Sequence, residues 1–193
     1  KWANINEFTN KIEVLTFIDQ GISIDWLKKC GVKVQNILAK GSFNHLKHQL
    51  RKTKENHFDD VKKIIELGDK YDISSNIYLE DWSNGMKNSV DYVFEFIQML
   101  SKTNVRRIML PDTLGILNPQ MTFSYISDLC AEFPNLHFDF HGHNDYDLSV
   151  ANTLEAIKAG CNGIHSTING MGERAGNTPL ASIIAVSYTH LTL

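Results

Sequence analysis

The sequence predicts an α/β fold, namely an incomplete (β/α)8 TIM barrel in which units three to eight are present and the first two are missing. Three observations support this prediction. Strand-like and helix-like segments alternate along the 193 residues, the connections between them are short, and one face of the strands is polar. Alternating strands and helices form a parallel sheet, and a polar inner face is typical of a barrel enzyme.

Consecutive strand-helix units follow one another without a linker or a low-complexity segment. The expected strands span residues 11–18, 32–39, 73–80, 105–111, 136–141 and 163–168. The expected helices span residues 22–30, 55–71, 89–101 and 148–159, and two further helices begin near residues 118 and 178. Gly31 and Gly160 stop two of these helices, and Asn118 followed by Pro119 matches the N-cap and first turn of another. The short loops are those of a parallel α/β fold.

The two faces of the strands distinguish a barrel from an open, doubly wound sheet. Strands of an open sheet covered by helices on both sides are apolar on both faces. In this chain Asp139, His141 and His143 share one face, whereas Ile77 and Leu79 lie on an aliphatic face of another strand. The polar face converges at the carboxyl ends of the strands. Because a whole barrel needs about 250 residues, we expect residues 1–186 to form a partial barrel that carries the catalytic function.

The last residues of the chain, 187–193, are predicted to be a non-native tail. Their β-branched and polar side chains are expected to break the last helix. The segment also resembles the translated read-through of a sequencing adaptor. The frayed end of a helix is the alternative.

Composition and charge limit the classes of function. Hydrophobic residues make up 42% of the chain and charged residues 21%, which is ordinary for a globular protein. The net charge of −3 and the lack of a long basic run argue against nucleic acid and against an anionic membrane as partners. No apolar stretch reaches the roughly 20 residues of a membrane span. Cys30, Cys130 and Cys161 lie far apart without metal or redox spacing, which suits a reducing, cytoplasmic location.

His141 and His143 predict a metal site. They lie two residues apart at the end of a strand, so their side chains point the same way with Cα atoms about 7 Å apart. Asn169, at the end of the next strand, is expected to be a further, weaker ligand, with a plain turn-forming Asn as the alternative. Asp139 lies about 7 Å deeper along the strand than His141 and is predicted to be buried and paired with His165.

Three motifs together resemble one enzyme family. They are His141-Gly142-His143-Asn144-Asp145, the loop from Asn169 to Asn177, and Pro111-Asp112-Thr113-Leu114-Gly115. In combination they resemble the acetyl-CoA-dependent 2-oxo acid condensing enzymes, which are the 2-isopropylmalate, citramalate and homocitrate synthases and are related to hydroxymethylglutaryl-CoA lyase. The segment Tyr78-Leu79-Glu80-Asp81-Trp82-Ser83-Asn84-Gly85 is most similar to the citramalate synthase-like branch. The resemblance covers residues 11–186.

The resemblance implies a reaction and a set of partners. The reaction is a Claisen condensation of acetyl-CoA with a 2-oxo acid, as in leucine and isoleucine biosynthesis, by an acyltransferase that converts the acyl group to alkyl. A divalent cation (Mn²⁺, Mg²⁺ or Zn²⁺) held by two His and a carboxylate polarises the keto group. The full-length protein is expected to be a homodimer.

The resemblance also assigns roles to residues. Glu80 is expected to orient the substrate or to act as a general base, and Thr113 to bind the substrate carboxylate. Leu15, Leu38 and Tyr78 are expected to wall the side-chain pocket, and their bulk fits pyruvate better than 2-oxoisovalerate. Nothing basic among these three residues would meet a distal carboxylate. The loop expected to lie near acetyl-CoA contributes Gly170, Gly172, Glu173, Arg174, Gly176 and Asn177. Asp145 and Asp147 are predicted to cap a helix.

The start of the chain departs from the family pattern. The first strand of the family carries an Arg-Asp pair, which supplies a metal ligand and a catalytic cation, and nothing before Lys11 matches it. The sequence therefore predicts a fragment without condensing activity of its own. Two alternatives remain open. One is a lyase, which carries a Cys in the glycine-rich loop where residues 169–177 have none. The other is a non-catalytic barrel remnant.

Overall fold

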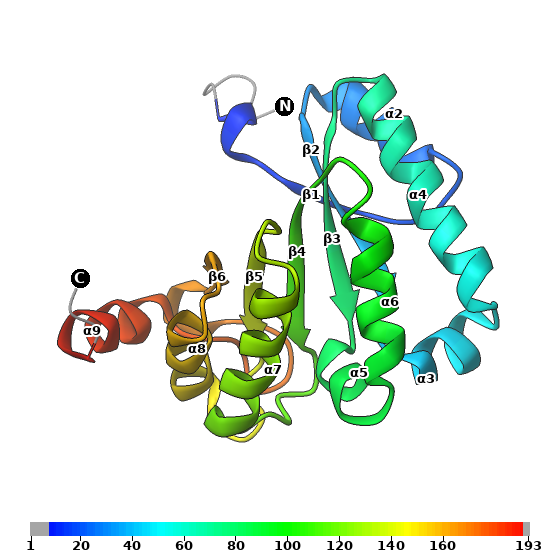
Figure 1. Cartoon of the computed structure of the whole chain (residues 1–193). Coiled ribbons are helices and arrows are strands. Elements are labelled where there is room, and N and C mark those ends of the chain that lie inside the picture. Colours follow the sequence, from blue (N-terminus) through cyan, green and yellow to red (C-terminus); the bar gives the residue numbers. More distant parts are fainter. Residues whose placement is uncertain (1–7, 191–193) are drawn as a thin grey trace.

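The computed structural model describes residues 8–190 and contains one sheet of parallel strands (Figure 1). The strands are β1 Val14–Thr16, β2 Val34–Lys40, β3 Ser74–Glu80, β4 Val105–Asp112, β5 Phe138–Gly142 and β6 Gly163–His165. Their spatial order is β1-β2-β3-β4-β5-β6, so each strand pairs in parallel with the next one along the chain. This is the order of a TIM-barrel wall. Within the described residues β1 and β6 are the two edges of the sheet and do not pair with each other, so the barrel is incomplete.

The helices follow the strands along the outer side of this wall, from α2 and α4 at one end to α8 and α9 at the other (Figure 1). The long ones are α2 Ile22–Cys30, α4 Lys54–Lys70, α6 Val90–Leu100, α7 Pro119–Glu132, α8 Ser149–Lys158 and α9 Leu180–His190. Short elements are the 3-10 helices η1 Thr9–Lys11 and η3 Ile168–Gly170, the helices α3 Phe43–His45 and α5 Trp82–Asn88, and the π-helix η2 Leu46–Leu50. No helix in the described part combines the length and the apolar character needed to cross a membrane.

Helix ends confirm some predictions and correct others. The side chain of Asn118 caps α7 by accepting a hydrogen bond from the Met121 amide at 2.8 Å, with Pro119 in the first turn. The C-terminal expectation was wrong in one respect, because α9 continues unbroken through His190. Serine and threonine hydroxyls there bond to carbonyls of the preceding turn, as Thr189 does to Ala185 at 3.0 Å, so they do not break the helix. The identity of residues 187–193 as a non-native tail stays a prediction, and residues 191–193 lie outside the described part.

The hydrophobic core lies between the outer face of the strands and the helices. Ile77 and Leu79 of β3 and Phe138 and Phe140 of β5 are completely buried. Helical residues that are equally buried complete this layer: Ile65, Phe96, Ile97, Ile126 and Leu129. The apolar outer face and the polar inner face are therefore arranged as the alternation of the sequence predicts.

The register of the strands aligns the inward-facing residues in rows. Tyr78 is the Cα partner of Leu38 on one side and of Met109 on the other, and Met109 in turn aligns with Asp139. One step closer to the carboxyl ends, His141 aligns with His165. Since all strands run the same way, their carboxyl ends meet at one rim, which is where barrel enzymes place their active sites.

Candidate functional site

A cavity of about 230 Å³ opens at the carboxyl ends of the strands. It brings together most of the residues that the sequence analysis proposed for the pocket, the metal site and catalysis. Its walls are formed by Leu15, Leu38, Tyr78, Glu80, Pro111, Thr113, His141, His143 and Glu173. The cavity lining contains two carboxylates and, among the described residues, no lysine or arginine.

The two histidines lie side by side in the wall of this cavity, with their Nε2 atoms facing each other. The Nε2 atoms of His141 and His143 are 3.3 Å apart. Because a metal–imidazole bond is about 2.0–2.1 Å long, two nitrogens bound to one cation at an angle of 90–110° are separated by about 2.9–3.4 Å. The observed separation fits two ligands of a single divalent cation.

Both imidazoles are held in the neutral form that binds metals. Burial, followed by the charges of His165 and His143, lowers the pKa of His141 to about 3. Burial, followed by the charge of Arg174, lowers the pKa of His143. The Nδ1 atoms of His141 and His143 are buried and have no hydrogen-bond partner among the described residues. The structure therefore gives this pair no evident role in holding the fold together.

The amide that the structure brings to the histidines is that of Asn177. Its Nδ2 lies 3.3 Å from His141 Nε2, and the residue is 7% exposed. The two ends of an amide are assigned from their surroundings, so a half-turn of the group would present Oδ1 to the same point. Asn169 instead adopts a left-handed backbone (φ 56°) in η3 and is exposed. The sequence analysis placed Asn177 in the glycine-rich loop and missed this contact. The contact depends on how residues 172–176 fold back toward the strand ends.

Arg174 fastens the loop to the neighbouring strand ends. Its guanidinium donates to both carboxylate oxygens of Asp145, at 2.7 and 2.9 Å, and to the carbonyl oxygen of Thr113 at 2.7 Å. The expectation that Asp145 caps a helix was therefore wrong, because Arg174 occupies its carboxylate. At the start of α8 it is the Asn144 side chain that accepts from the Ser149 amide, at 3.1 Å. The loop is thus fixed beside the strand ends that line the cavity.

Two glycines make this loop conformation possible. Gly176 has a φ of +92°, where other residues are strained. A Cβ atom on Gly172 would lie only 1.8 Å from Asn177 Oδ1. The glycines of the loop therefore allow the backbone to approach Asn177 and leave its amide beside His141. Their predicted role near acetyl-CoA stays a prediction.

The predicted catalytic side chains lie on the same rim. Glu80 forms an ion pair with Lys40, and His45 Nδ1 lies 3.9 Å from its other oxygen. Thr113 Oγ1 accepts a hydrogen bond from the Asp81 amide at 2.8 Å. Since a hydroxyl has one proton to donate, the Thr113 hydroxyl can still donate that proton to a group in the cavity.

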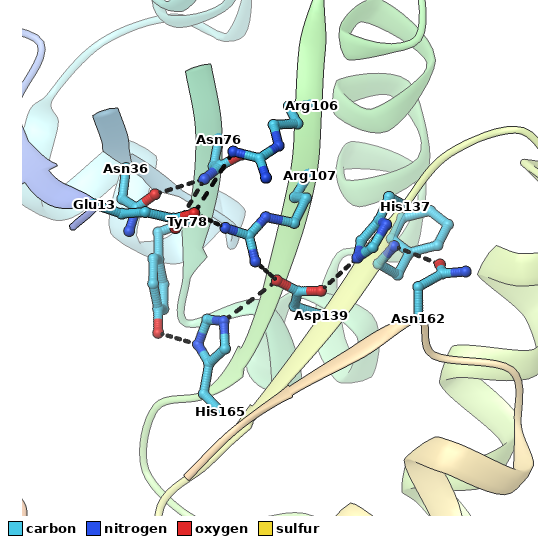
Figure 2. A network of polar contacts seen from close by, with 11 residues as sticks. Glu13, Asn36, Asn76, Tyr78, Arg106, Arg107, His137, Asp139, Asn162 and His165 are labelled. Atoms are coloured by element: carbon cyan, nitrogen blue, oxygen red, sulfur yellow. Dashed lines mark hydrogen bonds and ion pairs between the residues drawn. The ribbon is translucent and has the colours of Figure 1, made fainter. Parts of the chain in front are cut away.

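Beneath the cavity a polar network crosses the inner face of the strands (Figure 2). The Tyr78 hydroxyl is 2.8 Å from His165 Nδ1, and His165 Nε2 is 3.4 Å from Asp139 Oδ2. The predicted pairing of Asp139 with His165 is confirmed. Arg107 donates to Asp139 at 3.0 Å and also pairs with Glu13. This network was only partly foreseen, because the sequence gives no sign that Arg107 points inward past the register shift between Ser75 and Asn76.

Comparison with known proteins places the chain in context. The sequence model of one family, described as HMGL-like, matches residues 7–191. Among curated proteins, the homocitrate synthase of Sulfurisphaera tokodaii is 36% identical over 146 residues, which are 76% of this chain and 31% of the relative. The chain therefore spans about a third of the length of that relative.

Solved structures show the same fold. The HMG-CoA lyase of Bacillus subtilis superposes with a TM-score of 0.79 at 18% identity, over 92% of this chain and 62% of the other. An HMG-CoA lyase of Acinetobacter baumannii, solved with coenzyme A and 3-methylmalate, gives a TM-score of 0.67 at 20% identity, over 84% and 56% of the two chains. The barrel type that was predicted from the strand faces is confirmed.

Proposed function

The chain belongs to the HMGL-like family, and we propose on this basis that it serves the metal-dependent condensation of acetyl-CoA with a 2-oxo acid. The observation that supports this function is the cavity at the strand ends, in which two neutral imidazoles lie 3.3 Å apart beside Glu80 and Thr113. The likeness to a homocitrate synthase supports condensing chemistry in general. The 2-isopropylmalate or citramalate type, and the role in branched-chain amino-acid biosynthesis, are our finer proposal.

A divalent cation fits the residues that are present. His141 and His143 would supply two nitrogen ligands, and the amide oxygen of Asn177 a third, after the half-turn described above. The separation of the two Nε2 atoms and the neutral state of the rings agree with this assignment. A cation held there would polarise the keto oxygen of the substrate as negative charge develops on it.

Thr113 would hold the carboxylate of the 2-oxo acid. Its hydroxyl oxygen is already used as an acceptor by the Asp81 amide, so its proton is directed to a partner elsewhere. A carboxylate oxygen in the cavity is a strong acceptor for that proton. Thr113 thereby orients the keto carbon for attack.

Glu80 would remove a proton from the methyl carbon of acetyl-CoA. A proton must leave the methyl carbon of the thioester before that carbon attacks the keto group, and Glu80 lines the cavity as a carboxylate. Lys40 pairs with one oxygen of this carboxylate, and His45 lies 3.9 Å from the other. The carboxylate can take the proton directly or through one water molecule, while its position stays fixed.

The pocket walls favour a small, apolar 2-oxo acid. Leu15, Leu38 and Tyr78 line the cavity as the sequence analysis expected. Glu80 and Glu173 are the ionisable carboxylates of the lining, and a distal carboxylate on the substrate would meet no cation there. We therefore propose pyruvate rather than 2-oxoisovalerate or 2-oxoglutarate, although the relative named above is a homocitrate synthase.

The remaining predictions concern the surroundings of this site. The loop with Gly170, Gly172, Glu173, Arg174, Gly176 and Asn177 is proposed to face acetyl-CoA, and one structural neighbour was solved with coenzyme A. We keep a homodimeric full-length protein and a cytoplasmic location as proposals. Cleavage by a lyase is the second candidate, supported by the HMG-CoA lyase neighbours in fold only.

The decisive experiment measures release of free CoA thiol from acetyl-CoA in the presence of pyruvate, 2-oxoisovalerate or 2-oxoglutarate, with Mn²⁺, Mg²⁺ or Zn²⁺. The chain 1–193 is assayed beside the same chain preceded by the first two strand-helix units of the Sulfurisphaera tokodaii relative. We expect pyruvate-dependent thiol release from the extended protein and none from 1–193. Thr113→Val in the extended protein tests the proposed carboxylate contact. It should raise KM for pyruvate about tenfold.

Three outcomes contradict the proposal. Cleavage of hydroxymethylglutaryl-CoA without any condensation would favour the lyase. Thiol release that does not depend on a 2-oxo acid would indicate hydrolysis. Release by 1–193 alone would refute the predicted inactivity of this chain and show that the ligands present in 1–193 are sufficient.

A further inference from the structure

Asp81 occupies the junction between β3 and α5. Strand β3 ends at Glu80 and α5 begins at Trp82, so Asp81 is the single residue between them (Figure 1). It is 1% exposed and has a left-handed backbone with a φ of 67°. Residues other than glycine rarely adopt this conformation unless surrounding contacts hold them in it. The contacts of Asp81 therefore show what maintains this junction.

The carboxylate of Asp81 is bound by side chains rather than by the helix that follows it. Ser42 Oγ donates to Oδ2 at 2.6 Å, and Asn84 Nδ2 donates to Oδ1 at 2.8 Å. His45 Nε2 lies 3.5 Å from Oδ2. An Asp at the start of a helix commonly accepts from a backbone N–H of the first turn, but this side chain makes no such bond with α5. The carboxylate instead ties the end of β3 to the start of α3.

The peptide between Glu80 and Asp81 connects three strand ends. Its carbonyl oxygen, that of Glu80, accepts from the Gly41 amide at 2.7 Å, directly after β2. Its N–H, that of Asp81, donates to Thr113 Oγ1 at 2.8 Å, directly after β4. Because a peptide is planar, ψ of Glu80 and φ of Asp81 set its orientation. The left-handed φ of Asp81 therefore determines where this N–H points.

The direction of the bond to Thr113 decides what Thr113 offers to the cavity. A backbone N–H can only donate, so Thr113 Oγ1 is the acceptor in this bond. The hydroxyl keeps its single proton, and Thr113 lines the cavity. The Asp81 N–H thus occupies one side of the oxygen and leaves the proton to point away from it.

We propose that Asp81 is a positioning residue, whose buried carboxylate holds the peptide that directs the Thr113 hydroxyl proton into the cavity. This inference rests on the proposed function, because it names what fixes the group that would bind the carboxylate of the 2-oxo acid. The conformation matters here more than the charge. An amide at position 81 could still accept from Asn84 and donate to Ser42 Oγ, whereas glycine adopts the left-handed backbone but has no side chain to hold it.

The first test examines the Thr113 side chain in the chain 1–193 and needs no substrate. Three-bond ¹⁵N–¹³Cγ and ¹³C′–¹³Cγ couplings distinguish a single χ1 rotamer from an average over several. We expect one rotamer in the native chain and in Asp81→Asn, and an average in Asp81→Gly. Asp72→Gly is the matched control, because Asp72 is also left-handed, with a φ of 56°, but its side chain is 93% exposed. It should leave the couplings of Thr113 unchanged.

The second test measures KM and kcat for pyruvate by thiol release from the extended protein described above. Asp81→Gly should raise KM about fivefold and leave kcat within about twofold, and Asp81→Asn should keep KM within about twofold of the native value. In a Thr113→Val background, Asp81→Gly should raise KM no further, since the two residues act through one hydrogen bond. A merely structural role of Asp81 would add its own effect to that of Thr113→Val.

The two measurements separate this inference from the proposed function. An averaged Thr113 rotamer in the native chain, or a single rotamer in Asp81→Gly, overturns the positioning role, whatever the activity. Additive effects in the double variant overturn it as well. An extended protein without pyruvate-dependent release contradicts the proposed function, and the couplings still decide the role of Asp81. If Asp81→Gly fails to fold, Ser42→Ala, which removes one donor to the same carboxylate, replaces it in both measurements.

Discussion

The inner face of the sheet has a lower and an upper layer, and the polar side chains of the two layers are arranged differently. In the lower layer Glu13 and Asp139 each meet the guanidinium of Arg107, so opposite charges compensate one another (Figure 2). In the upper layer His141 and His143 are neutral, and their Nε2 atoms face each other. The charges of the lower layer are paired with one another. The upper layer has donor atoms directed at a space that a ligand can fill.

This difference explains where function lies in the barrel. A buried polar group without a partner costs free energy, and a ligand that pairs with it removes that cost. Buried charges that are paired hold a structure in one arrangement, and removing one of them leaves the other uncompensated. Changes in the lower layer should therefore act on stability, and changes in the upper layer should act on ligand binding.

The largest expected effect is on stability in the lower layer. Arg107→Met removes the cation between Glu13 and Asp139 and leaves the carboxylate of Asp139, 1% exposed, without its ion pair. Breaking a buried pair by removal of one partner costs about 3–5 kcal/mol. Because the Arg107 side chain is itself partly exposed, we expect a loss of about 3 kcal/mol. Urea unfolding of the two proteins measures it.

Arg106 is the matched control for this change. It lies next to Arg107, its side chain is 53% exposed, and its closest approach to Glu13 is 3.7 Å. A surface ion pair of this kind contributes about 0–1 kcal/mol, so Arg106→Met should be nearly neutral. Equal losses for the two variants would show that the lower layer is not held by its buried charges.

The next effect concerns metal binding in the upper layer. His143→Ala removes one of the two nitrogens that face each other and should weaken binding of Zn²⁺ or Mn²⁺ at least 100-fold, which is about 2.7 kcal/mol. The metal-free variant should keep its stability, because the lost Nδ1 has no partner among the described residues. Calorimetric titration gives the affinity and urea unfolding the stability. His48→Ala, on the exposed part of η2, is the control and should change neither; an unchanged affinity in His143→Ala would remove this residue from the metal site.

Asn177 and Asn169 are the two amides that could contribute to metal binding in the upper layer. Asn177 lies 3.3 Å from His141 Nε2, whereas Asn169 is exposed. We expect Asn177→Ala to weaken metal binding about tenfold, within the range seen when groups around a metal are lost. Asn169→Ala should change it less than twofold. The reverse order, measured by the same titration, would restore the assignment made from sequence.

Much of the fold was predictable because its signals are local. Helix α2 was predicted with its observed bounds of Ile22 and Cys30, and the cap at Asn118 was found from the residue type alone. The helix α5 was missed because its sequence, Trp82–Asn88, carries glycine and asparagine, which are weak helix formers. Its start is instead determined by Asp81, which adopts a left-handed backbone with a φ of 67°. That conformation depends on tertiary contacts and has no sequence signature.

The site was predictable as a set of residues and less so as a set of contacts. Spacing of two on a strand placed His141 and His143 on one face, and the structure brings their Nε2 atoms within 3.3 Å. The choice between Asn169 and Asn177 depends on how the glycine loop folds back, which strand alternation cannot describe. The same limit applies to Arg174, whose partner Asp145 is 29 positions away in the chain. Contacts between loops need the folded backbone.

The smallest expected effect tests whether a depressed histidine pKa by itself marks a ligand site. His57, on α4, is 1% exposed, and its Nε2 accepts a hydrogen bond from the Lys40 amide at 3.2 Å. Burial, followed by the charge of Lys52, lowers its pKa from 6.5 to about 4. Between these values the unfolded chain binds a proton that the folded chain does not, so stability is complete above pH 6.5 and falls as the pH falls toward 4.

Because of His57, lowering the pH from 7.5 to 5.5 should therefore reduce the free energy of unfolding by about 1.3 kcal/mol. Metal binding should not change. Urea unfolding of the native chain and of His57→Gln at both pH values isolates this part, because His141 and His143 contribute equally to the two proteins. The glutamine carbonyl can still accept from the Lys40 amide, so His57→Gln should fold and lose less stability at pH 5.5. His48→Gln should follow the native pH dependence. If His57→Gln follows it too, burial does not hold this imidazole neutral, and the neutral state of the upper-layer histidines would need a cause other than burial.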